Sequence, residues 1–369
     1  MKILVTGANG FIGKNLVTEL HNIGKNEILK FDLDTPIDFL DEYTGKCDFV
    51  FHLAGINRPD DDSEFITGNV DFTSNLLNSL IANNNKCPIM ISSSTQAILE
   101  NSYGRSKRAG EELIFNYGKK YNVKTLVYRF PNVFGKWCKP NYNSAVATFC
   151  NNIANDIPIK MNDPSVKMNL IYIDDVVKEL INALQDKEQR ENEYCFVLPV
   201  YQTYLGEIVK RIYSFKNSRN TLSVPVLNHE FEKKLYSTYI SYLPKDKFSY
   251  DLKMNVDQRG SFTEFIKTPD RGQVSINISK SGITKGNHWH HTKNEKFLVV
   301  SGKGVIRFRK INSAEIIEYF VSGDKLQVVD IPVGYTHNIE NLGETEMVTV
   351  MWVNEILDQR NPDTYFEKV

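Results

Sequence analysis

The segment TGANGFIG, residues 6–13, lies between a short apolar run and a stretch of helical periodicity over residues 11–23. Its glycines suit three tasks: Gly7 permits a tight turn, Gly10 lets the backbone approach a pyrophosphate, and Gly13 lets the helix pack on the strand. Free N–H groups at the start of a helix, together with the helix dipole, favour such an anion. The alternative is an ordinary glycine-rich turn. The predicted dinucleotide contacts in this segment are Gly7, Asn9, Gly10, Phe11, Ile12 and Gly13.

An acidic residue ends the next apolar run. Asp32 follows Gly7 by 25 positions, where a carboxylate can accept hydrogen bonds from an adenosine ribose diol and repels a 2′-phosphate. Asp32 by itself therefore favours NADH over NADPH, and no arginine follows closely to receive a phosphate. The alternative is an acid that faces solvent at the end of a strand.

Up to about residue 213, short apolar runs alternate with amphipathic stretches. This order predicts strands and helices in turn, and hence a parallel sheet with helices on both faces. The pattern weakens over residues 216–228. We therefore expect an α/β domain with a Rossmann-like, doubly wound parallel sheet over residues 1–245. The predicted strands are residues 3–5, 27–32, 48–54 and 88–93, and the predicted helices are residues 11–23 and 69–83.

From about residue 248 onward, apolar residues follow a period of two, as in VSINI from residue 274 and VIRFR from residue 305. Further runs of this type begin at residues 316, 326 and 347, and glycines and asparagines separate them. Many short strands of this kind predict an antiparallel barrel or sandwich. We place this all-β domain at residues 246–369.

A tyrosine and a lysine stand four positions apart in the first domain. On a helix, Tyr103 and Lys107 share one face. A lysine ammonium beside a phenol lowers the pKa of the phenol, so that Tyr103 could exchange a proton with a carbonyl or an alcohol near neutral pH. Lys107 could also hold a nicotinamide ribose, and the serines at residues 92–94 could donate a hydroxyl to the same carbonyl. The alternative is a pair on the protein surface, because the spacing is common by chance.

Four of the seven histidines fall between residues 288 and 337. His288 and His290 point to one face of a strand because they are two positions apart. Glu295 and His337 could reach the same ion from neighbouring strands, whereas His291 is out of phase. Three imidazoles and one carboxylate suit Zn²⁺, Fe²⁺, Mn²⁺ or Ni²⁺. The alternative is an exposed histidine cluster without a metal.

Together, the motifs of the first 245 residues resemble the extended short-chain dehydrogenase/reductase family, which acts largely on nucleotide sugars. The resemblance implies that Ser94, Tyr103 and Lys107 are catalytic, and that Asn132 and Lys136 face a substrate nucleotide. It also implies cofactor contacts from Leu53, Ala54, Gly55 and Lys107. The further matching motifs are HLAG at residues 52–55, NV at 69–70, RFPNVFG at 129–135 and YIDDV at 172–176.

The two histidine segments resemble both motifs of the cupin family of jelly-roll barrels. The order of the two domains, together with GKWCKPNY at residues 135–142 and NHWHHTKNE at residues 287–295, makes the whole chain similar to the bifunctional CapF-type enzymes of capsular polysaccharide synthesis. The resemblance implies a route to UDP-N-acetyl-L-fucosamine. The cupin domain would epimerise C3 of a UDP-2-acetamido-2,6-dideoxy-hexos-4-ulose. The reductase domain would then reduce the C4 ketone with NADPH to the L-talose product.

Epimerisation followed by reduction is chemically reasonable, because the adjacent C4 ketone acidifies the proton on C3. Lys296, beside Glu295, is a weak candidate for the C3 base. Two alternatives remain: a reductase whose cupin is only a zinc-stabilised dimerisation or ligand-binding module, and a non-catalytic redox sensor. The intact Tyr103 and Lys107 argue against the second. NADPH is implied by the resemblance and NADH is favoured by Asp32, so both cofactors stay open.

The composition narrows the choice of partners and location. The chain has 44 basic and 45 acidic side chains and a net charge of -1, whereas a nucleic-acid partner requires a basic surface. Five scattered cysteines suit reduced thiols in the cytoplasm. No apolar run approaches the roughly 18 residues of a membrane span. We therefore expect a cytoplasmic homodimer that binds a UDP-linked 4-keto-6-deoxy amino sugar.

Overall fold

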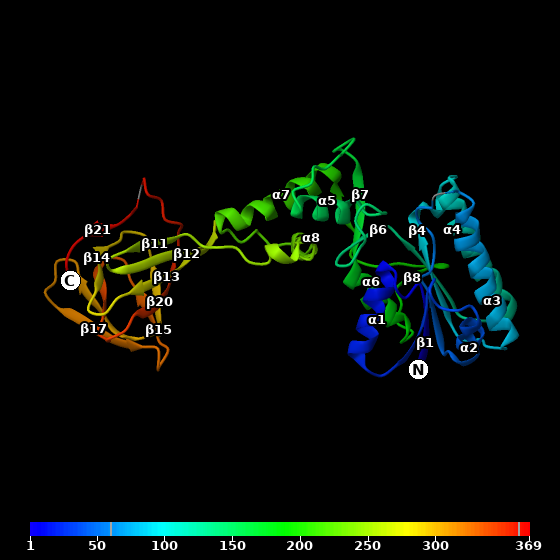
Figure 1. Cartoon of the computed structure of the whole chain (residues 1–369), viewed down its shortest axis with the longest axis horizontal. Helices are drawn as coiled ribbons and strands as arrows, with labels where there is room; N and C mark the ends of the chain where they lie inside the picture. The colour runs from blue at the N-terminus through cyan, green and yellow to red at the C-terminus, as the bar shows by residue number, and fades with distance from the viewer. Residues whose placement is uncertain (60, 361) are drawn as a thin grey trace. The chain divides into compact units, whose positions relative to one another are not determined.

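The computed structural model describes residues 1–59, 61–360 and 362–369, which form two compact units (Figure 1). The first unit comprises Met1–Tyr213 and Leu227–Pro244. The second comprises Ser214–Val226 and Lys245–Val369. The segment 214–226 thus joins the second unit, where Val224 N–H donates to Lys267 O and Lys267 N–H donates to Leu222 O.

The first unit is built on a seven-stranded sheet in the order β2-β1-β3-β4-β5-β9-β8. All neighbouring pairs are parallel except β8 with β9. This confirms the predicted Rossmann-like parallel sheet. Its strands are β1 (Lys2–Thr6), β2 (Glu27–Phe31), β3 (Phe49–His52), β4 (Ile89–Ser94), β5 (Thr125–Phe130), β8 (Arg190–Glu191) and β9 (Tyr194–Cys195). A small second sheet contains β6 (Asn132–Phe134), β7 (Lys167–Tyr172) and β10 (Tyr201–Tyr204).

Helices cover both faces of the large sheet (Figure 1). Successive residues of β1 enter different cores: Ile3 and Val5 pack in one apolar cluster, and Leu4 packs in the other. This two-sided burial is the reason that the strands are apolar throughout. The helices of this unit are α1 (Phe11–Ile23), α2 (Asp38–Lys46), the π-helix η1 (Ile66–Asp71), α3 (Phe72–Ala82), η2 (Thr95–Ile98), α4 (Ser102–Tyr121), α5 (Ala145–Ala154), α6 (Ile173–Ala183) and α8 (Glu230–Ile240).

Two helical stretches are longer than the sequence pattern indicates. The segment from residue 216, where the apolar pattern weakens, continues the helix α7 (Leu205–Thr221). The predicted helix over residues 69–83 begins earlier, as the π-helix η1 followed by α3. Among the described residues, no helix is long and apolar enough to cross a membrane.

The second unit contains two antiparallel sheets, as predicted. Six strands follow the order β11-β12-β13-β20-β15-β18, and five follow β17-β16-β19-β14-β21. A short helix, η3 (Lys245–Lys247), precedes them. The strands of the six-stranded sheet are β11 (Met254–Asp257), β12 (Gly260–Thr268), β13 (Gly272–Ser279), β15 (Glu295–Ser301), β18 (Val328–Ile331) and β20 (Met347–Val353). Those of the other sheet are β14 (Thr284–Trp289), β16 (Lys303–Lys310), β17 (Ile316–Ser322), β19 (Tyr335–Asn341) and β21 (Tyr365–Phe366).

The interior of the second unit is apolar in one part and polar in another. Phe297, Ile306, Phe308 and Ile339 belong to its apolar core. On β13, by contrast, alternate buried residues are polar, and several of them line a cavity. Buried polar side chains need hydrogen-bonding partners, and these pair along the strand: Gln273 donates to Ser275 and Asn277 donates to Ser279, each at 3.1 Å. The buried polar residues of β13 are Gln273, Ser275, Asn277 and Ser279.

Candidate functional site

The glycine-rich turn has the geometry that a pyrophosphate requires. Gly7 has a φ of 68°, and a Cβ atom there would lie 2.7 Å from the amide nitrogen of Ala54. A Cβ on Gly13 would lie 2.1 Å from Gly7 O, so the helix packs on the turn only with glycine. No side chain among the described residues caps α1 at Gly10. The first N–H groups of α1 are therefore available to an anion.

Asp32 lies beside this turn. Its carboxylate accepts the N–H of Asn9 at 2.6 Å and the N–H of Leu33 at 2.8 Å. The side-chain amide of Asn9 also reaches Asp34 at 3.5 Å. The two acids fit the neutral diol of a ribose, and their charge opposes a phosphate on it.

The loop after β3 borders the same turn. Residues 53–55 follow His52, which is buried between the hydroxyls of Thr6 and Thr73, each 2.8 Å from a ring nitrogen. Burial lowers the pKa of His52 to about 3. Its ring is therefore a neutral, packed element of the strand. Asn69 holds the loop further along, since its amide exchanges two hydrogen bonds with the backbone of Ile56.

Tyr103 and Lys107 lie on α4, one helical turn apart, and the Lys107 Nζ atom is 5.9 Å from the centre of the Tyr103 ring. Lys107 donates to Ser92 O at 3.3 Å. The hydroxyl of Tyr103 donates to the side chain of Asn57 at 2.9 Å, a partner that the sequence analysis missed. Ser94 is the partly exposed serine of its triplet, and its hydroxyl accepts the N–H of Gln96 at 3.1 Å.

The pKa of Tyr103 differs from the sequence expectation. Burial raises it, and a hydrogen bond from Ser94 opposes that rise only in part. The expected lowering is therefore not found in this structure, because burial of the phenol outweighs the effects that lower its pKa. Burial also lowers the pKa of Lys107, to about 8. The phenol therefore holds its proton until a partner draws it away.

An ion pair between Glu111 and Arg129 lies near Lys107 and affects its pKa. Glu111, on α4, is 2% exposed and accepts from Arg129 Nε at 2.9 Å, while the Ser93 hydroxyl donates to the same carboxylate. The guanidinium also stacks on Tyr194, 4.0 Å from the ring centre. The negative charge of Glu111 raises the pKa of Lys107 against the effect of burial. No local sequence pattern indicates this group, because Glu111 and Arg129 lie on different elements of the chain.

The two predicted substrate contacts lie in a second region of the same unit. Asn132 is exposed on β6, and its amide donates to Asn169 O at 3.4 Å. Lys136 follows β6 and forms an ion pair with Asp174 at the start of α6. Both predicted contacts are thus accessible from solvent.

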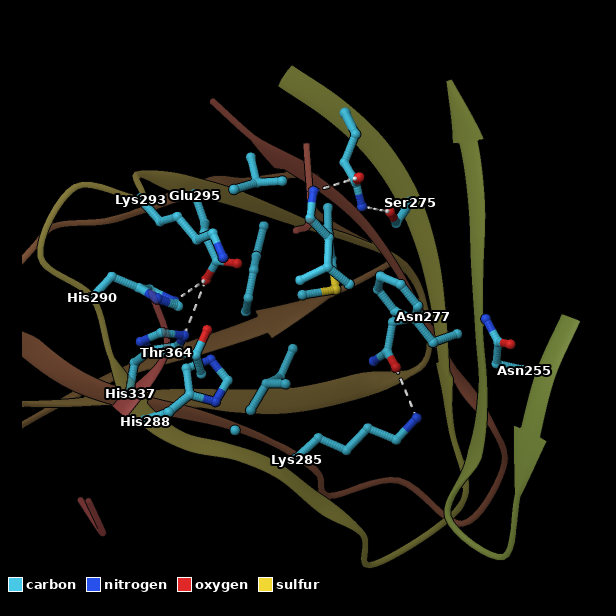
Figure 2. A pocket seen from close by; sticks show the side chains of 18 of the residues that line it. Asn255, Ser275, Asn277, Lys285, His288, His290, Lys293, Glu295, His337 and Thr364 are labelled. Carbon is cyan, nitrogen blue, oxygen red and sulfur yellow. Dashed lines mark hydrogen bonds and ion pairs between the residues drawn. The ribbon is translucent and has the colours of Figure 1, made fainter. Parts of the chain in front are cut away.

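The four predicted metal ligands come together in the second unit. Their donor atoms all lie within 4.8 Å of one another, and Figure 2 shows the side chains of His288, His290, Glu295 and His337 converging. Glu295 Oε2 is 3.1 Å from His337 Nε2 and 3.5 Å from His290 Nε2. His291 is exposed and packs on Trp289, as its phase in the strand predicted.

The electrostatics of the four residues fit a cation. Several of their buried nitrogen and oxygen atoms have no hydrogen-bond partner among the described residues. Burial and the neighbouring His337 lower the pKa of His288 to about 4. Burial opposes ionisation of Glu295, but the nearby rings of His290 and His337 prevail and lower its pKa to about 2. A neutral imidazole and an ionised carboxylate are the forms that bind a divalent metal.

The C-terminal segment completes this site. His290 Nδ1 lies 2.6 Å from the carbonyl oxygen of Asp363, so it is the protonated ring nitrogen and Nε2 faces Glu295. The carboxylate of Asp363 accepts the N–H groups of His291, Thr292 and Lys293. No sequence pattern indicated these contacts, because they join residues about seventy positions apart.

The four residues line one side of a cavity of about 290 Å³. This volume is close to the lower end of small-molecule sites, about 300 Å³. Polar and charged side chains form much of the rest of the wall (Figure 2). They include Asn255, Asp257, Arg259, Gln273, Ser275, Asn277 and Lys285.

The parallel sheet with its glycine-rich turn and the antiparallel second unit each match a known protein family. Residues 3–197 match the NAD dependent epimerase/dehydratase family, and residues 255–365 match the polysaccharide biosynthesis C-terminal domain. The chain belongs to the NAD dependent epimerase/dehydratase family.

Within this class, the predicted resemblance to CapF-type proteins is confirmed. The crystal structure of the capsular polysaccharide assembling protein CapF from Staphylococcus aureus is 57% identical, covers 100% of both chains and has a TM-score of 0.95. The UDP-2-acetamido-2,6-beta-L-arabino-hexul-4-ose reductase of Pseudomonas aeruginosa is 44% identical over 99% of this chain and 98% of its own length. UDP-glucuronic acid 4-epimerase from Bacillus cereus, at 20% identity and a TM-score of 0.56, shares the fold over 66% of this chain and 98% of its own.

Proposed function

We propose that this chain is a bifunctional nucleotide-sugar enzyme of capsular polysaccharide synthesis. Its second unit is a cupin that epimerises C3 of UDP-2-acetamido-2,6-dideoxy-hexos-4-ulose. Its first unit reduces the C4 ketone to UDP-2-acetamido-2,6-dideoxy-L-talose. The observation that carries the two-step proposal is that the four-residue cluster lies in the wall of a cavity of about 290 Å³, which also contains polar and charged side chains. Four protein ligands alone would also suit a structural zinc, so the space beside the cluster is the feature that favours a reaction there.

The reductase step follows from the groups on α4. NADPH, or alternatively NADH, supplies a hydride to C4 when bound. Tyr103 gives its proton to the oxygen of C4, and Ser94 donates a hydrogen bond to the same oxygen. The charge of Lys107 stabilises the phenolate that remains. Because the pKa of Tyr103 is raised in the free protein, this transfer is driven by the negative charge that develops on the sugar oxygen.

The epimerase step follows from the acidity of C3. A Zn²⁺ ion, or another divalent metal, held by His288, His290, Glu295 and His337 would draw electron density from the ketone. Loss of the C3 proton leaves an enolate, whose charge is stabilised at the oxygen of C4. Return of a proton to the opposite face inverts C3. The four ligands have their lone pairs committed to the metal, so the proton must be handled by another group.

The test uses the full-length protein with the UDP-4-keto sugar in D₂O. Tyr103→Phe should stop NAD(P)H oxidation, while NMR still detects deuterium entering C3. This variant is preferable to a truncation after residue 245, because residues 214–226 belong to the second unit. An adjacent variant on α4, Arg105→Lys, is the matched control and should retain both activities.

The alternative function is a reductase whose second unit only binds zinc and stabilises a dimer. It predicts no deuterium at C3 in Tyr103→Phe, even when the metal content and the melting temperature match those of the unmodified protein. Deuterium at C3 without reduction would contradict it. Wild-type NAD(P)H turnover in Tyr103→Phe would contradict the proton-donor role instead.

A further inference from the structure

A β-bulge in β14 changes which side chains face the cavity. Lys285 lies opposite Ile339 on β19, and His288 lies opposite His337, with a shift in register between them. Without that shift, Lys285 and His288, three positions apart, would point to opposite faces. The extra residue returns both side chains to the interior. Bulges of this kind often re-aim a side chain beside an active site.

The bulge has a specific backbone requirement. Gly286 and Asn287 have φ angles of 106° and 58°, which an L-residue seldom adopts. A Cβ on Gly286 would also lie 2.8 Å from His337 O. Gly286 and Asn287 therefore allow the bulge that places Lys285 in the cavity.

Within the cavity, the hydrogen bonds of Lys285 to described residues all go to neutral acceptors. Its Nζ atom is 2.7 Å from Asn277 Oδ1, 2.9 Å from Ile278 O and 3.5 Å from Ser261 O. Figure 2 shows Lys285 and Asn277 on one side of the cavity and Glu295 on the other. The two short hydrogen bonds use two N–H groups. The third and longest contact, to Ser261 O, accounts for the remaining N–H group of the ammonium. On losing a proton, Lys285 would give up this contact, keep the two short ones and gain a lone pair.

The other ionisable groups of the cavity wall are already committed. Asp257 and Arg259 form an ion pair at 2.6 Å, and Lys293 contacts Pro362 O and Glu355. Among the residues that the structure describes, Lys285 is the ionisable group of this wall that is neither a candidate metal ligand nor within 4 Å of an opposite charge.

The candidate base suggested by the sequence does not reach the cavity. Lys296 follows Glu295 on β15 and so points to the other face of the strand. It is exposed and forms an ion pair with Asp330 on β18. Lys296 is therefore not the C3 base, and it supplies a matched control for experiments on Lys285.

We propose that Lys285 is the acid–base residue that exchanges the proton on C3 of the keto sugar in the second unit. The inference rests on the proposed epimerase function and adds the group that this function lacks. The amine of Lys285 takes the C3 proton, and the C–H electron pair stays on the sugar as an enolate. Water gives a proton to the opposite face of C3. The ammonium of Lys285 then protonates the hydroxide that is left, which restores water and the amine.

The charge environment agrees with this role. Burial lowers the pKa of Lys285, while Asp257 raises it and Arg259 lowers it. These two residues belong to the β11–β12 hairpin. Asn277 and Ile278 on β13 and Ile339 on β19 add no charge. Asp257 and Arg259 act in opposite directions, and a partly desolvated lysine reaches its amine form more readily than one on the surface.

The experiment measures deuterium entry at C3 in D₂O without a reductant, so that the reductase step is silent. Lys285→Met should lower the exchange rate by about 100-fold or more, with a KM within about threefold of the unmodified protein. Lys285→Arg keeps a charge that does not titrate in this range and should be as impaired. Lys296→Met should exchange at the rate of the unmodified protein. Metal content and melting temperature identify any variant that fails to fold.

The outcomes separate this inference from the function on which it rests. If the unmodified protein incorporates no deuterium at C3, the epimerase function itself is wrong. If it does exchange, an exchange rate in Lys285→Met within about threefold of normal overturns the role of Lys285. Full activity in Lys285→Arg, or a raised KM with an unchanged kcat in Lys285→Met, would also overturn it, because either indicates binding rather than proton transfer. Should Lys285→Met not fold, a folded Lys285→Arg provides the same decision.

Discussion

Removal of the buried negative charge of Glu111, one helical turn after Lys107, should lower the stability of the first unit. It should also change the pH dependence of its kcat/KM. The perturbation is Glu111→Gln, which keeps the shape of the side chain. Glu111 is 2% exposed and receives hydrogen bonds from Arg129, Ser93 and Tyr194. In the variant, the guanidinium of Arg129 loses its charged partner.

The size of the stability effect follows from the burial of the two partners. Breaking a fully buried ion pair costs about 3–5 kcal/mol. The Arg129 side chain is 24% exposed and stacks on Tyr194, so we expect about 2–3 kcal/mol. For a domain of this size, that corresponds to a fall of roughly 5–10 °C in the melting temperature.

The catalytic effect follows from the pKa of Lys107. This pKa is about 8 because burial lowers it and Glu111 raises it. The ammonium is lost as the pH rises through the pKa, so a reaction that needs it should decline above about pH 8. Without the charge of Glu111, the pKa should fall by roughly one further pH unit. The alkaline limb of kcat/KM should then move to about pH 7.

The assay is NADPH oxidation with the keto sugar over a pH series, together with calorimetry of the full-length protein. Glu112→Gln is the matched control, because Glu112 is the exposed neighbour on the same helix. An unchanged alkaline limb in Glu111→Gln would refute the electrostatic support of Lys107. If the melting temperature falls but the alkaline side of the pH profile of kcat/KM does not move, Glu111 has a purely structural role.

Further predictions concern the cofactor, the metal and the assembly. If Asp32 binds the ribose diol, NADH should be used at least as well as NADPH, and Asp32→Asn should shift the ratio of their kcat/KM values toward NADPH. A strong NADPH preference before mutation would show that Asp32 points away or that other groups accommodate the phosphate. His290→Ala should lower bound zinc in the dialysed protein, measured by atomic emission, whereas His291→Ala should not; equal zinc in both variants would contradict the ligand set. Light scattering at micromolar concentration should give a dimer, twice the 42.4 kDa of one chain, and a monomeric mass would count against it.

The structure also changes how one of these experiments is designed. Asp32 anchors the glycine-rich turn through the N–H of Asn9. An alanine would remove this anchor along with the charge, so a change in cofactor preference could reflect a displaced turn. Asparagine retains an oxygen acceptor, which separates the electrostatic effect from the structural one.

Much of the first site was predictable because it depends on local patterns. Three glycines between a strand and a helix define a turn within a few residues, and the spacing of Tyr103 and Lys107 places them on one helical face. The HxH pair at residues 288 and 290 likewise follows from strand geometry. The choice of Lys296 as a base failed, because adjacency to Glu295 in the chain means the opposite face of the strand.

The sequence by itself therefore determined the parallel and antiparallel halves, the glycine-rich turn, the tyrosine–lysine pair and the four metal-ligand candidates. Only the tertiary structure decided that burial raises the pKa of Tyr103 and that Asp363 lies against His290. It also decided that Lys285 faces the cavity. Those facts depend on the registers of strands distant in the chain, and a single extra residue opposite β19 reverses the face of every residue beyond it.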